Sequence, residues 1–307
     1  MYTYDIPVPA RFQWVNSPKV EEILSKFLKP SSRGRRGYNK TYMFRWIMAK
    51  HLLGWSYRDL EGVTGIHHTT FIKFRKRLMH TLWFSKVFKL LASQVVAGQK
   101  KLNLIVDSSF AETYSKKKEQ GSAYSGYKKK VGFKLHSVID YVTRLPLMQV
   151  ATPGNCADIT LGKHLIRGTP RSWNVKSLTA DKGYDCSDFV HDIFQGWHGV
   201  KIGIQIKKTS QKTSLEEQKK TQNYKLKAKE RCLSKKLYNT RSEIERYYSR
   251  KKGVFNLGEE RTRHLKNFRV NCYTTSIMEI LEWMSKNSLL RVLFSKLENQ
   301  NLTKQRM

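Results

Sequence analysis

Two aspartates stand directly after short apolar runs of the chain. Asp107 follows LNLIV, and Asp181 follows VKSLTA. A carboxylate at the end of a buried strand is held at the edge of a sheet, where ligands usually bind. Either aspartate alone could instead cap a helix or close a turn. Their matching positions, 74 residues apart in a strongly basic chain, favour a shared chemical role.

A third carboxylate, Glu245, lies in a segment with helical character. The residues that share its predicted face are Tyr238, Arg241, Glu245 and Lys252. Their offsets of 0, 3, 7 and 14 residues place them within an arc of roughly 60° at 100° per residue. Glu243 falls well off that face. A surface helix with i, i+4 charge pairs would have a similar pattern, so this segment alone does not decide its role.

Five segments together resemble DDE transposases of insertion-sequence families four and five. The spacing Y-x2-R-x3-E-x6-K from Tyr238 to Lys252 resembles their signature. IVDSSF and TADKGYD, with Asp107 and Asp181, resemble the segments that carry their first two catalytic aspartates. G-x-K-L-H at 132–136 and P-G-N-x-x-D at 153–158 resemble segments between those aspartates. The similarity covers roughly residues 40–290.

This resemblance implies an α/β fold, an RNase H-like mixed sheet with flanking helices, preceded by a helical, helix-turn-helix-like domain. It also implies that Asp107, Asp181 and Glu245 are the catalytic residues and the ligands of two Mg²⁺ ions. Asp107 would bridge the ions, and each of the other two would complete one side. Hard cations prefer carboxylate oxygens, and Mn²⁺ could substitute for Mg²⁺.

The remaining signature residues are expected to contact DNA. Arg241 and Lys252 would hold phosphates near the scissile bond, and Tyr238 would position the backbone or stack on a base. A protein of this kind binds the ends of an insertion sequence, cleaves phosphodiesters and joins the freed 3′-OH to target DNA. Its partner is double-stranded DNA, on which we expect a homodimer.

Two other functions fit parts of the sequence. A DNA-binding regulator derived from a transposase would keep the basic charge and the helix-turn-helix without needing the three carboxylates. A related nuclease would carry the same site and hydrolyse DNA without strand transfer. A strand-transfer assay distinguishes the second alternative.

The charge of the chain points to a polyanionic partner. Its 58 Lys and Arg against 24 Asp and Glu give a formal net charge of +34. Such an excess repels itself unless it is neutralised, and phosphate neutralisation dominates nucleic-acid binding. A ribosomal role or a generally basic proteome would give a similar balance.

The first 95 residues are predicted to be a helical DNA-binding region. An apolar pattern indicates a helix that ends at Gly54, a second capped by Ser56, and a third from about His68 to Met79. In the third helix Phe71, Phe74 and Leu78 should face the core. The residues predicted on the opposite side, where they could contact bases and phosphates, are Thr69, Lys73 and Lys76. An ordinary amphipathic bundle with a basic face is the alternative.

Residues 96–297 are predicted to form the catalytic domain, with 298–307 as a tail. The strand candidates are KLNLIVD, VGFKLHSVID, RLPLMQVAT, VKSLTAD and GVKIGIQIK, with helices near 158–167 and 187–194. Helices are also expected at 237–252 and 275–296. Residues 207–236 contain 11 basic and 3 acidic residues, a net charge of 11 − 3 = +8, and are predicted to be a flexible or DNA-ordered insertion. A solvated surface loop is the alternative.

The four cysteines contain no C-x-x-C pair, so neither a zinc-thiolate site nor a disulfide framework is expected. His67 and His68 could ligate a metal, but the sequence shows no completing cluster and favours a turn or helix cap.

The N-terminus lacks the pattern of a signal peptide, and no apolar run is long enough for a membrane span. We therefore expect a cytoplasmic, nucleoid-associated protein without a membrane partner.

Overall fold

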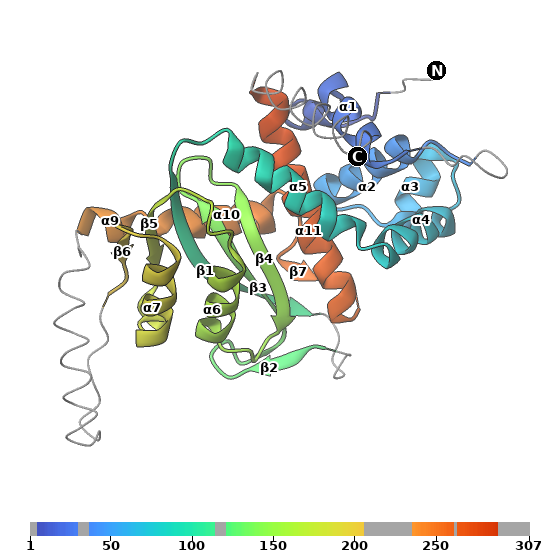
Figure 1. The fold of residues 1–307 in the computed structure, drawn as a ribbon. Coiled ribbons are helices and arrows are strands. Elements are labelled where there is room, and N and C mark those ends of the chain that lie inside the picture. Colours follow the sequence, from blue (N-terminus) through green and yellow to red (C-terminus); the bar gives the residue numbers. More distant parts are fainter. Residues whose placement is uncertain (1–4, 30–36, 114–120, 206–234, 261–262, 288–307) are drawn as a thin grey trace, which may run out of the picture. The chain divides into compact units, whose positions relative to one another are not determined.

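The computed structural model describes residues 5–29, 37–113, 121–205, 235–260 and 263–287 (Figure 1). These residues form two compact units. The first comprises the chain up to Gly98, Val254–Asn256 and the chain from Tyr273, and the second comprises Gln99–Gly253 and Leu257–Cys272. The sequence predicts residues 273–287 in the sheet-containing region. They group instead with the first unit, since helix α11 (Leu265–Lys286) contributes to both units.

The first unit is helical. Its elements are η1 (Ala10–Asn16), α1 (Pro18–Phe27), α2 (Lys40–Leu53), α3 (Tyr57–Thr64), α4 (His68–His80), α5 (Trp83–Ala97) and the later part of α11. Buried Arg45 fixes the beginning of the unit, because its guanidinium donates to Val15 O at 3.0 Å and to Asn16 Oδ1 at 2.7 Å. One charged side chain of α2 thereby bonds two polar groups at the end of the η1 segment.

The predicted helix boundaries in this unit are confirmed. Gly54 and Gly65 end α2 and α3 in the left-handed conformation, with φ of 67° at each. Ser56 forms a capping box with Asp59, in which each side chain accepts a hydrogen bond from the other residue's backbone. These local signals are strong because each one satisfies backbone groups that a helix end leaves unpaired.

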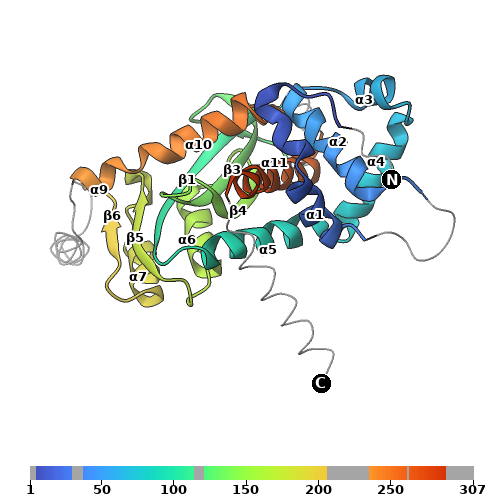
Figure 2. The same cartoon turned by 90° about the horizontal axis from the view of Figure 1, so that it is seen from above.

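The second unit is built on a seven-stranded mixed sheet (Figures 1 and 2). Its strands are β1 (Leu102–Thr113), β2 (Ala123–Ser125), β3 (Lys130–Asp140), β4 (Pro146–Pro153), β5 (Val175–Ala180), β6 (Lys201–Gly203) and β7 (Glu259–Glu260). Five of them follow the order β4-β3-β1-β5-β6, in which β4, β3 and β1 are antiparallel and β1, β5 and β6 are parallel. β2 adds to β3 and β7 adds to β1. This order, with helices between the later strands, confirms the expected RNase H-like fold.

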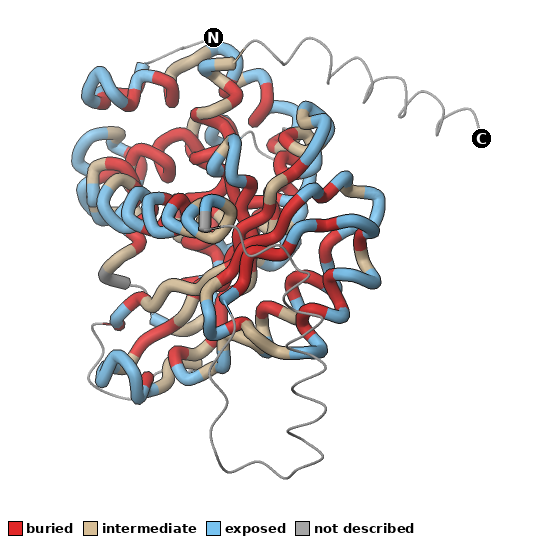
Figure 3. Tube along the Cα trace, turned by 90° about the vertical axis from the view of Figure 1, so that its left-hand side faces the viewer, coloured by how far each residue is buried: buried red, intermediate tan, exposed pale blue. Residues whose placement is uncertain are grey.

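Helices cover both faces of this sheet. The helices after β4 and β5 are α6 (Asp158–Gly168) and α7 (Ser187–Gly196), and they lie on one face (Figure 2). Helix α10 (Ser242–Gly253) and the first part of α11 cover the other, where Ile244, Tyr247 and Phe268 join the core around Ile105 and Phe133. The central strands are accordingly buried for most of their length (Figure 3).

Strand β1 is longer than the sequence predicts. It continues to Thr113, so Asp107 lies within the strand and not at its end. The error has a physical cause: Asp107, Ser108 and Ser109 interrupt the apolar run, but the chain still pairs with β3 up to Glu112 opposite Gly132. A strand that continues through polar residues carries no unbroken apolar run that would reveal it.

Several expectations fall outside the described residues. Most of the basic insertion at 207–236, the tail at 298–307 and the last part of the predicted 275–296 helix lie there. Within the described part of the chain, Cys156, Cys186 and Cys272 form no disulfide, and Cys232 lies outside it. No described helix is long and apolar enough to cross a membrane.

Gly132 permits the close pairing of β3 with β1, and replacing it should destabilise the second unit. A Cβ there would collide with the carbonyl of Ala111 and lie 2.7 Å from Cζ of Phe110. We expect Gly132→Ala to cost about 1–3 kcal/mol of unfolding free energy in urea titrations. Gly126→Ala is the control, because its Cβ would meet nothing within 4 Å. Equal stability of the two variants would contradict this packing.

Candidate active site

The register of two parallel strands places Asp107 and Asp181 together. β1 pairs with β5 up to Val106 opposite Ala180, and each aspartate is the next residue of its strand. Neighbouring strands lie about 4.8 Å apart, so the two aspartates leave the paired region side by side. Asp181 precedes the short helix η2 (Lys182–Tyr184) but makes no side-chain capping bond to it. Helix capping therefore does not occupy the Asp181 carboxylate.

The surroundings of Asp107 disfavour its negative charge. Burial raises its pKa from 3.8 to about 6, and the carboxylates of Asp181 and Asp158 act in the same direction. The backbone N–H of Ser108, which donates to Asp107 Oδ1 at 2.7 Å, and the charge of Arg241 oppose this shift. A bound cation would relieve the excess negative charge, and carboxylate oxygens are the donors that Mg²⁺ prefers. These residues therefore fit a divalent cation.

The signature segment is not one continuous helix. Tyr238 lies on α9 (Lys235–Asn239), Arg241 lies in the connection, and Glu245 and Lys252 lie on α10. The backbone bonds Arg241 N to Tyr238 O and Ile244 N to Arg241 O span three residues, as in a tightened 3₁₀ turn. The single 60° face predicted from the spacing is therefore wrong in detail, because the helix is interrupted between Tyr238 and Glu245.

Arg241 nevertheless brings part of this segment together. Its guanidinium lies 3.0 Å from Glu245 Oε1 and 5.7 Å from the centre of the Tyr238 ring. Its charge also acts on Asp107 and Asp181. The Tyr238 hydroxyl lies 3.5 Å from Asp181 Oδ1, at the limit of a hydrogen bond. One guanidinium thus interacts with all three carboxylates that the sequence singles out.

The three carboxylates do not converge on one point in this structure. In the described ranges, one set of three His, Cys, Asp or Glu ligand atoms lies within 4.8 Å of one another, and it does not include Asp107, Asp181 or Glu245. Glu245 is paired with Arg241 and its side chain is 60% exposed. Asp107 and Asp181 are adjacent through strand register, whereas Glu245 reaches them only through Arg241.

Glu243 has a separate environment. It is buried, and its carboxylate pairs with Arg144 at 2.7 Å and with Arg246 at 2.6 Å. It therefore lies away from Arg241, in agreement with its expected position off the signature face. Its ion pairs hold α10 to the turn after β3.

A hydroxyl from α10 fixes the backbone beside Asp107. The buried Tyr248 donates to Asp107 O at 2.7 Å and lies 3.2 Å from Leu135 O. Lys252, one turn further along the helix, is exposed over the residue as a whole, although partial desolvation of its ammonium, together with the charge of Lys128, lowers its pKa. Lys252 thus lies within electrostatic range of Lys128, in the turn between β2 and β3.

The sequence indicates no role for Asp158. This residue ends the P-G-N-x-x-D motif at 153–158 and contacts the G-x-K-L-H motif at 132–136. Ser108 Oγ donates to Asp158 Oδ1 at 2.7 Å, and Lys134 Nζ donates to the same oxygen at 3.0 Å. His136 Nδ1 lies 3.7 Å from that oxygen, while burial lowers the His136 pKa to about 4 and keeps the ring neutral at pH 7. Asp158 thus anchors the residue that follows Asp107. Only the fold brings these two motifs together.

Tyr184 is a second residue that the sequence did not single out. Its hydroxyl is buried and has no hydrogen-bond partner within the described residues. Burial raises the Tyr184 pKa well above 10, and the charges of Asp107 and Asp158 act in the same direction. The ring packs on Phe189 with centroids 5.6 Å apart, and a Cβ on Gly162 would collide with it.

The candidate DNA-binding residues of the first unit lie on α4. Lys73 and Lys76 are exposed, whereas Phe71, Phe74 and Leu78 are buried, as the helical spacing predicts. The remaining candidate, Thr69, is half-buried, and its hydroxyl lies 2.8 Å from Nδ1 of His67.

The raised pKa of Asp107 predicts a pH-dependent cost to stability. Below about pH 4 the carboxyl is protonated in both the folded and the unfolded chain, so it costs no stability. Between about pH 4 and pH 6 it ionises in the unfolded chain but stays protonated in the folded chain, and the stability of the fold decreases as the pH rises. Above about pH 6 the group is ionised in both states, and the full cost to folding is present. We expect Asp107→Asn to stabilise the metal-free protein at pH 8 by on the order of 2 kcal/mol and to have little effect at pH 4.

Urea titrations in chelator at both pH values test this expectation. Asp188→Asn is the control of opposite sign, because hydrogen bonding to Lys163 lowers the pKa of the Asp188 carboxyl. An Asp107→Asn protein that is less stable than the wild type at pH 8 would contradict the desolvation of Asp107.

Comparison with known proteins assigns the chain to a family. A search of curated proteins found no similar sequence. A cryo-EM structure of the piggyBac transposase synaptic complex with hairpin DNA has a TM-score of 0.42 and 13% identity, covering 96% of this chain and 78% of that chain. The fold assignment rests on the strand order and not on that low similarity. The family described as "Transposase DDE domain" matches residues 98–278, which hold Asp107, Asp181 and Glu245. The chain therefore belongs to the transposase DDE-domain family.

Proposed function

We propose that this protein cleaves DNA at the ends of an insertion sequence and joins the freed 3′-OH to target DNA. The observation that carries the proposal is the alignment of Asp107 and Asp181 at the end of the β1–β5 pairing, with Arg241 and Glu245 beside them. Membership of the transposase DDE-domain family supports the same reaction class.

In this proposal Asp107, Asp181 and Glu245 hold two divalent cations, Mg²⁺ or Mn²⁺. When bound, such a pair activates the attacking oxygen and stabilises the leaving oxygen of an in-line displacement. We propose that Asp107 would serve both cations, because the β1–β5 register brings it next to Asp181 and the charge of Arg241, which pairs with Glu245, acts on it. The Ser108 N–H donates to the Asp107 carboxylate, and the Tyr248 hydroxyl donates to the Asp107 backbone carbonyl, so both the side chain and the backbone of Asp107 are held in position.

Glu245 becomes a ligand by exchanging partners. In this structure its carboxylate pairs with Arg241, and that guanidinium partly compensates Asp107 and Asp181. We propose that Glu245 would leave Arg241 to serve as a ligand, and that the Arg241 guanidinium would then be available to a DNA phosphate. A planar guanidinium can bind a phosphate through two hydrogen bonds.

A basic and aromatic turn supports a DNA path over the second unit. Between β2 and β3, Tyr127 is 89% exposed, and Lys128 Nζ lies 5.0 Å from the centre of its ring. Lys128 also acts on the charge of Lys252. Exposed aromatic rings among lysines suit stacking on bases beside phosphate contacts.

The helical unit is proposed to recognise the element ends through α4, with Lys73 and Lys76 on phosphates and Thr69 near a base edge. Two copies of the chain are expected to act together on paired ends. A regulator without catalysis and a nuclease without strand transfer remain the alternatives. The first would bind the ends without cutting them, and the second would cut without joining.

Substitution of each proposed ligand tests the chemistry. We expect Asp107→Ala, Asp181→Ala and Glu245→Ala to reduce Mg²⁺-dependent cleavage of end-containing DNA about a thousandfold or more, because a metal cluster contributes several kcal/mol to the transition state. Binding to the ends should remain. Glu243→Gln is the control and should stay within about tenfold of wild type, since Glu243 pairs with Arg144 and Arg246. Near-normal cleavage by any of the three alanine variants would remove that residue from the site.

Substitution on α4 tests DNA binding separately. Lys73→Ala combined with Lys76→Ala should weaken binding at all ionic strengths and reduce the salt slope by about 1 for each phosphate that is no longer neutralised. The matched control is the double alanine variant at Lys86 and Lys89, which are exposed on α5 at the same spacing. Equal losses of affinity in the two double variants would indicate diffuse attraction without a specific role for α4.

A further inference from the structure

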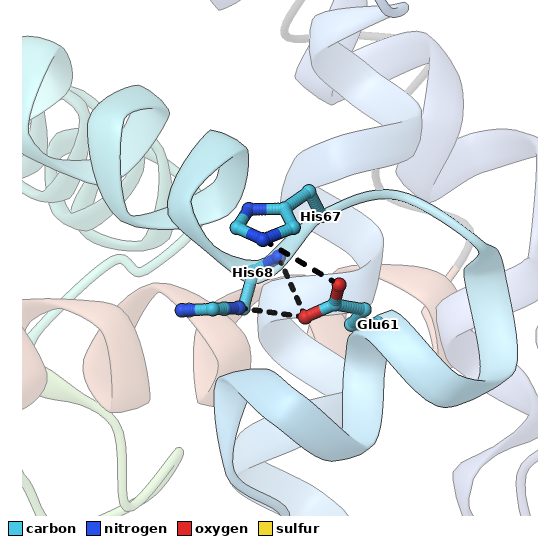
Figure 4. Close-up of side chains that lie close together, drawn as sticks. All are labelled: Glu61, His67 and His68. Carbon is cyan, nitrogen blue, oxygen red and sulfur yellow. Dashed lines mark hydrogen bonds and ion pairs between the residues drawn. The ribbon is translucent and has the colours of Figure 1, made fainter.

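Glu61, His67 and His68 meet at the turn between α3 and α4 (Figure 4). Glu61 lies in the last turn of α3, His67 is the residue before α4, and His68 begins α4. In Figure 4 the Glu61 carboxylate points toward both imidazole rings, whose centroids are 4.4 Å apart. The sequence did not predict this cluster, because it contains no recognisable metal-ligand spacing and Glu61 belongs to another helix.

The distances within this cluster suit a small cation. Glu61 Oε1 lies 3.7 Å from His67 Nε2, and Glu61 Oε2 lies 2.6 Å from His68 Nδ1. One ligand atom from each residue lies within 4.8 Å of the other two. Ligand atoms about 2.0–2.1 Å from a tetrahedral Zn²⁺ are about 3.3 Å from one another. The distance from Glu61 to His67 is longer than this value, and the distance from Glu61 to His68 is shorter. Small side-chain rotations would suffice.

A neighbouring hydroxyl could fix one ligand. His67 Nδ1 lies 2.8 Å from Thr69 Oγ1. Metal-bound histidines commonly donate their second ring N–H to an oxygen, which holds the ring and directs the other nitrogen to the metal. Donation from Nδ1 to Thr69 would leave Nε2 facing Glu61. A protonated Nδ1 could no longer accept the capping hydrogen bond from the Thr69 N–H. That bond is long, at 3.4 Å from Thr69 N to His67 Nδ1.

We propose that Glu61, His67 and His68 bind one transition-metal cation of the Zn²⁺ type. Two imidazoles and one carboxylate suit Zn²⁺, whereas Mg²⁺ prefers oxygen ligands alone. The His67 side chain is 59% exposed, so water can complete the coordination. The cation would join the end of α3 to the start of α4 and stiffen the turn that precedes Lys73 and Lys76. This consequence for DNA binding rests on the proposed function, whereas the metal site itself does not.

Direct titration of the full chain tests the site. Metal-free protein is titrated with Zn²⁺ in excess Mg²⁺, which would compete for the carboxylate site proposed around Asp107, and binding is followed by calorimetry. We expect one Zn²⁺ per chain in the wild type and an affinity reduced at least about tenfold in Glu61→Gln, His67→Asn and His68→Gln. His80→Gln, at the exposed end of the same helix, is the control and should bind like the wild type.

His67→Asn is the decisive variant, because asparagine caps helices well and preserves the start of α4 without an imidazole. Its melting temperature without metal should match the wild type, and added Zn²⁺ should raise only that of the wild type. Co²⁺ in place of Zn²⁺ should give visible absorption of a tetrahedral site in the wild type alone. Equal Zn²⁺ binding by wild type and His67→Asn, or none by either, would overturn the proposal and leave a Glu–His ion pair only.

DNA binding with and without Zn²⁺ then tests the consequence. Tighter binding of end-containing DNA by the zinc-loaded wild type, but not by zinc-treated His67→Asn, would support the stiffened turn. Zinc binding that leaves DNA affinity unchanged would contradict that consequence alone. Loss of cleavage activity would have no bearing on the zinc titration, so failure of the transposase proposal remains distinguishable.

Discussion

The parallel pairing of β1 with β5 ends at Val106 and Ala180, and a carboxylate follows on each strand at the same level. This register brings two like charges together in partly buried surroundings, where burial alone already raises the pKa of Asp107. Such an arrangement is unfavourable for folding without a positive charge. The neighbouring elements can be understood largely as ways of holding these carboxylates and compensating them.

Helix α10 provides both of these contributions. Its apolar side chains, including Ile244 and Tyr247, pack into the core below the sheet, and the Tyr248 hydroxyl binds the carbonyl of Asp107. The packed helix thereby presents Glu245, and Arg241 just before its first residue, near the end of the β1–β5 pairing. On the opposite face Asp158 binds Ser108 and Lys134. The segment around Asp107 is thus tied from both sides, as a pre-organised site requires.

Sequence patterns predicted the elements whose signals are local. Gly54, Ser56 and Gly65 mark helix ends through backbone conformation and capping, and apolar periodicity located the core of α4. Apolar runs located the strands before Asp107 and Asp181. The second half of β1 escaped prediction because Asp107, Ser108 and Ser109 interrupt its apolar run, and its partners β3 and β7 are other segments of the chain. Pairing across the sheet leaves no periodic mark in those polar residues.

Candidate residues for the site could be selected from the sequence where chemistry restricts residue types, but their arrangement could not be predicted where it depends on folding. The interruption between α9 and α10 is invisible to helical arithmetic, because Thr240 and Arg241 are compatible with a continuous helix. The links of Asp158 to Ser108 and of Glu61 to His68 join different elements. No spacing rule applied to a single segment could have detected them.

The exchange of Glu245 between Arg241 and a cation is the step on which this account of catalysis depends. Anomalous diffraction from Mn²⁺ in crystals of the protein bound to its element end would locate the cations directly. The account predicts manganese between Asp107 and Asp181, with Glu245 coordinated and Arg241 on a DNA phosphate. Manganese bound elsewhere, or bound at the aspartates while Glu245 remains paired with Arg241, would contradict it.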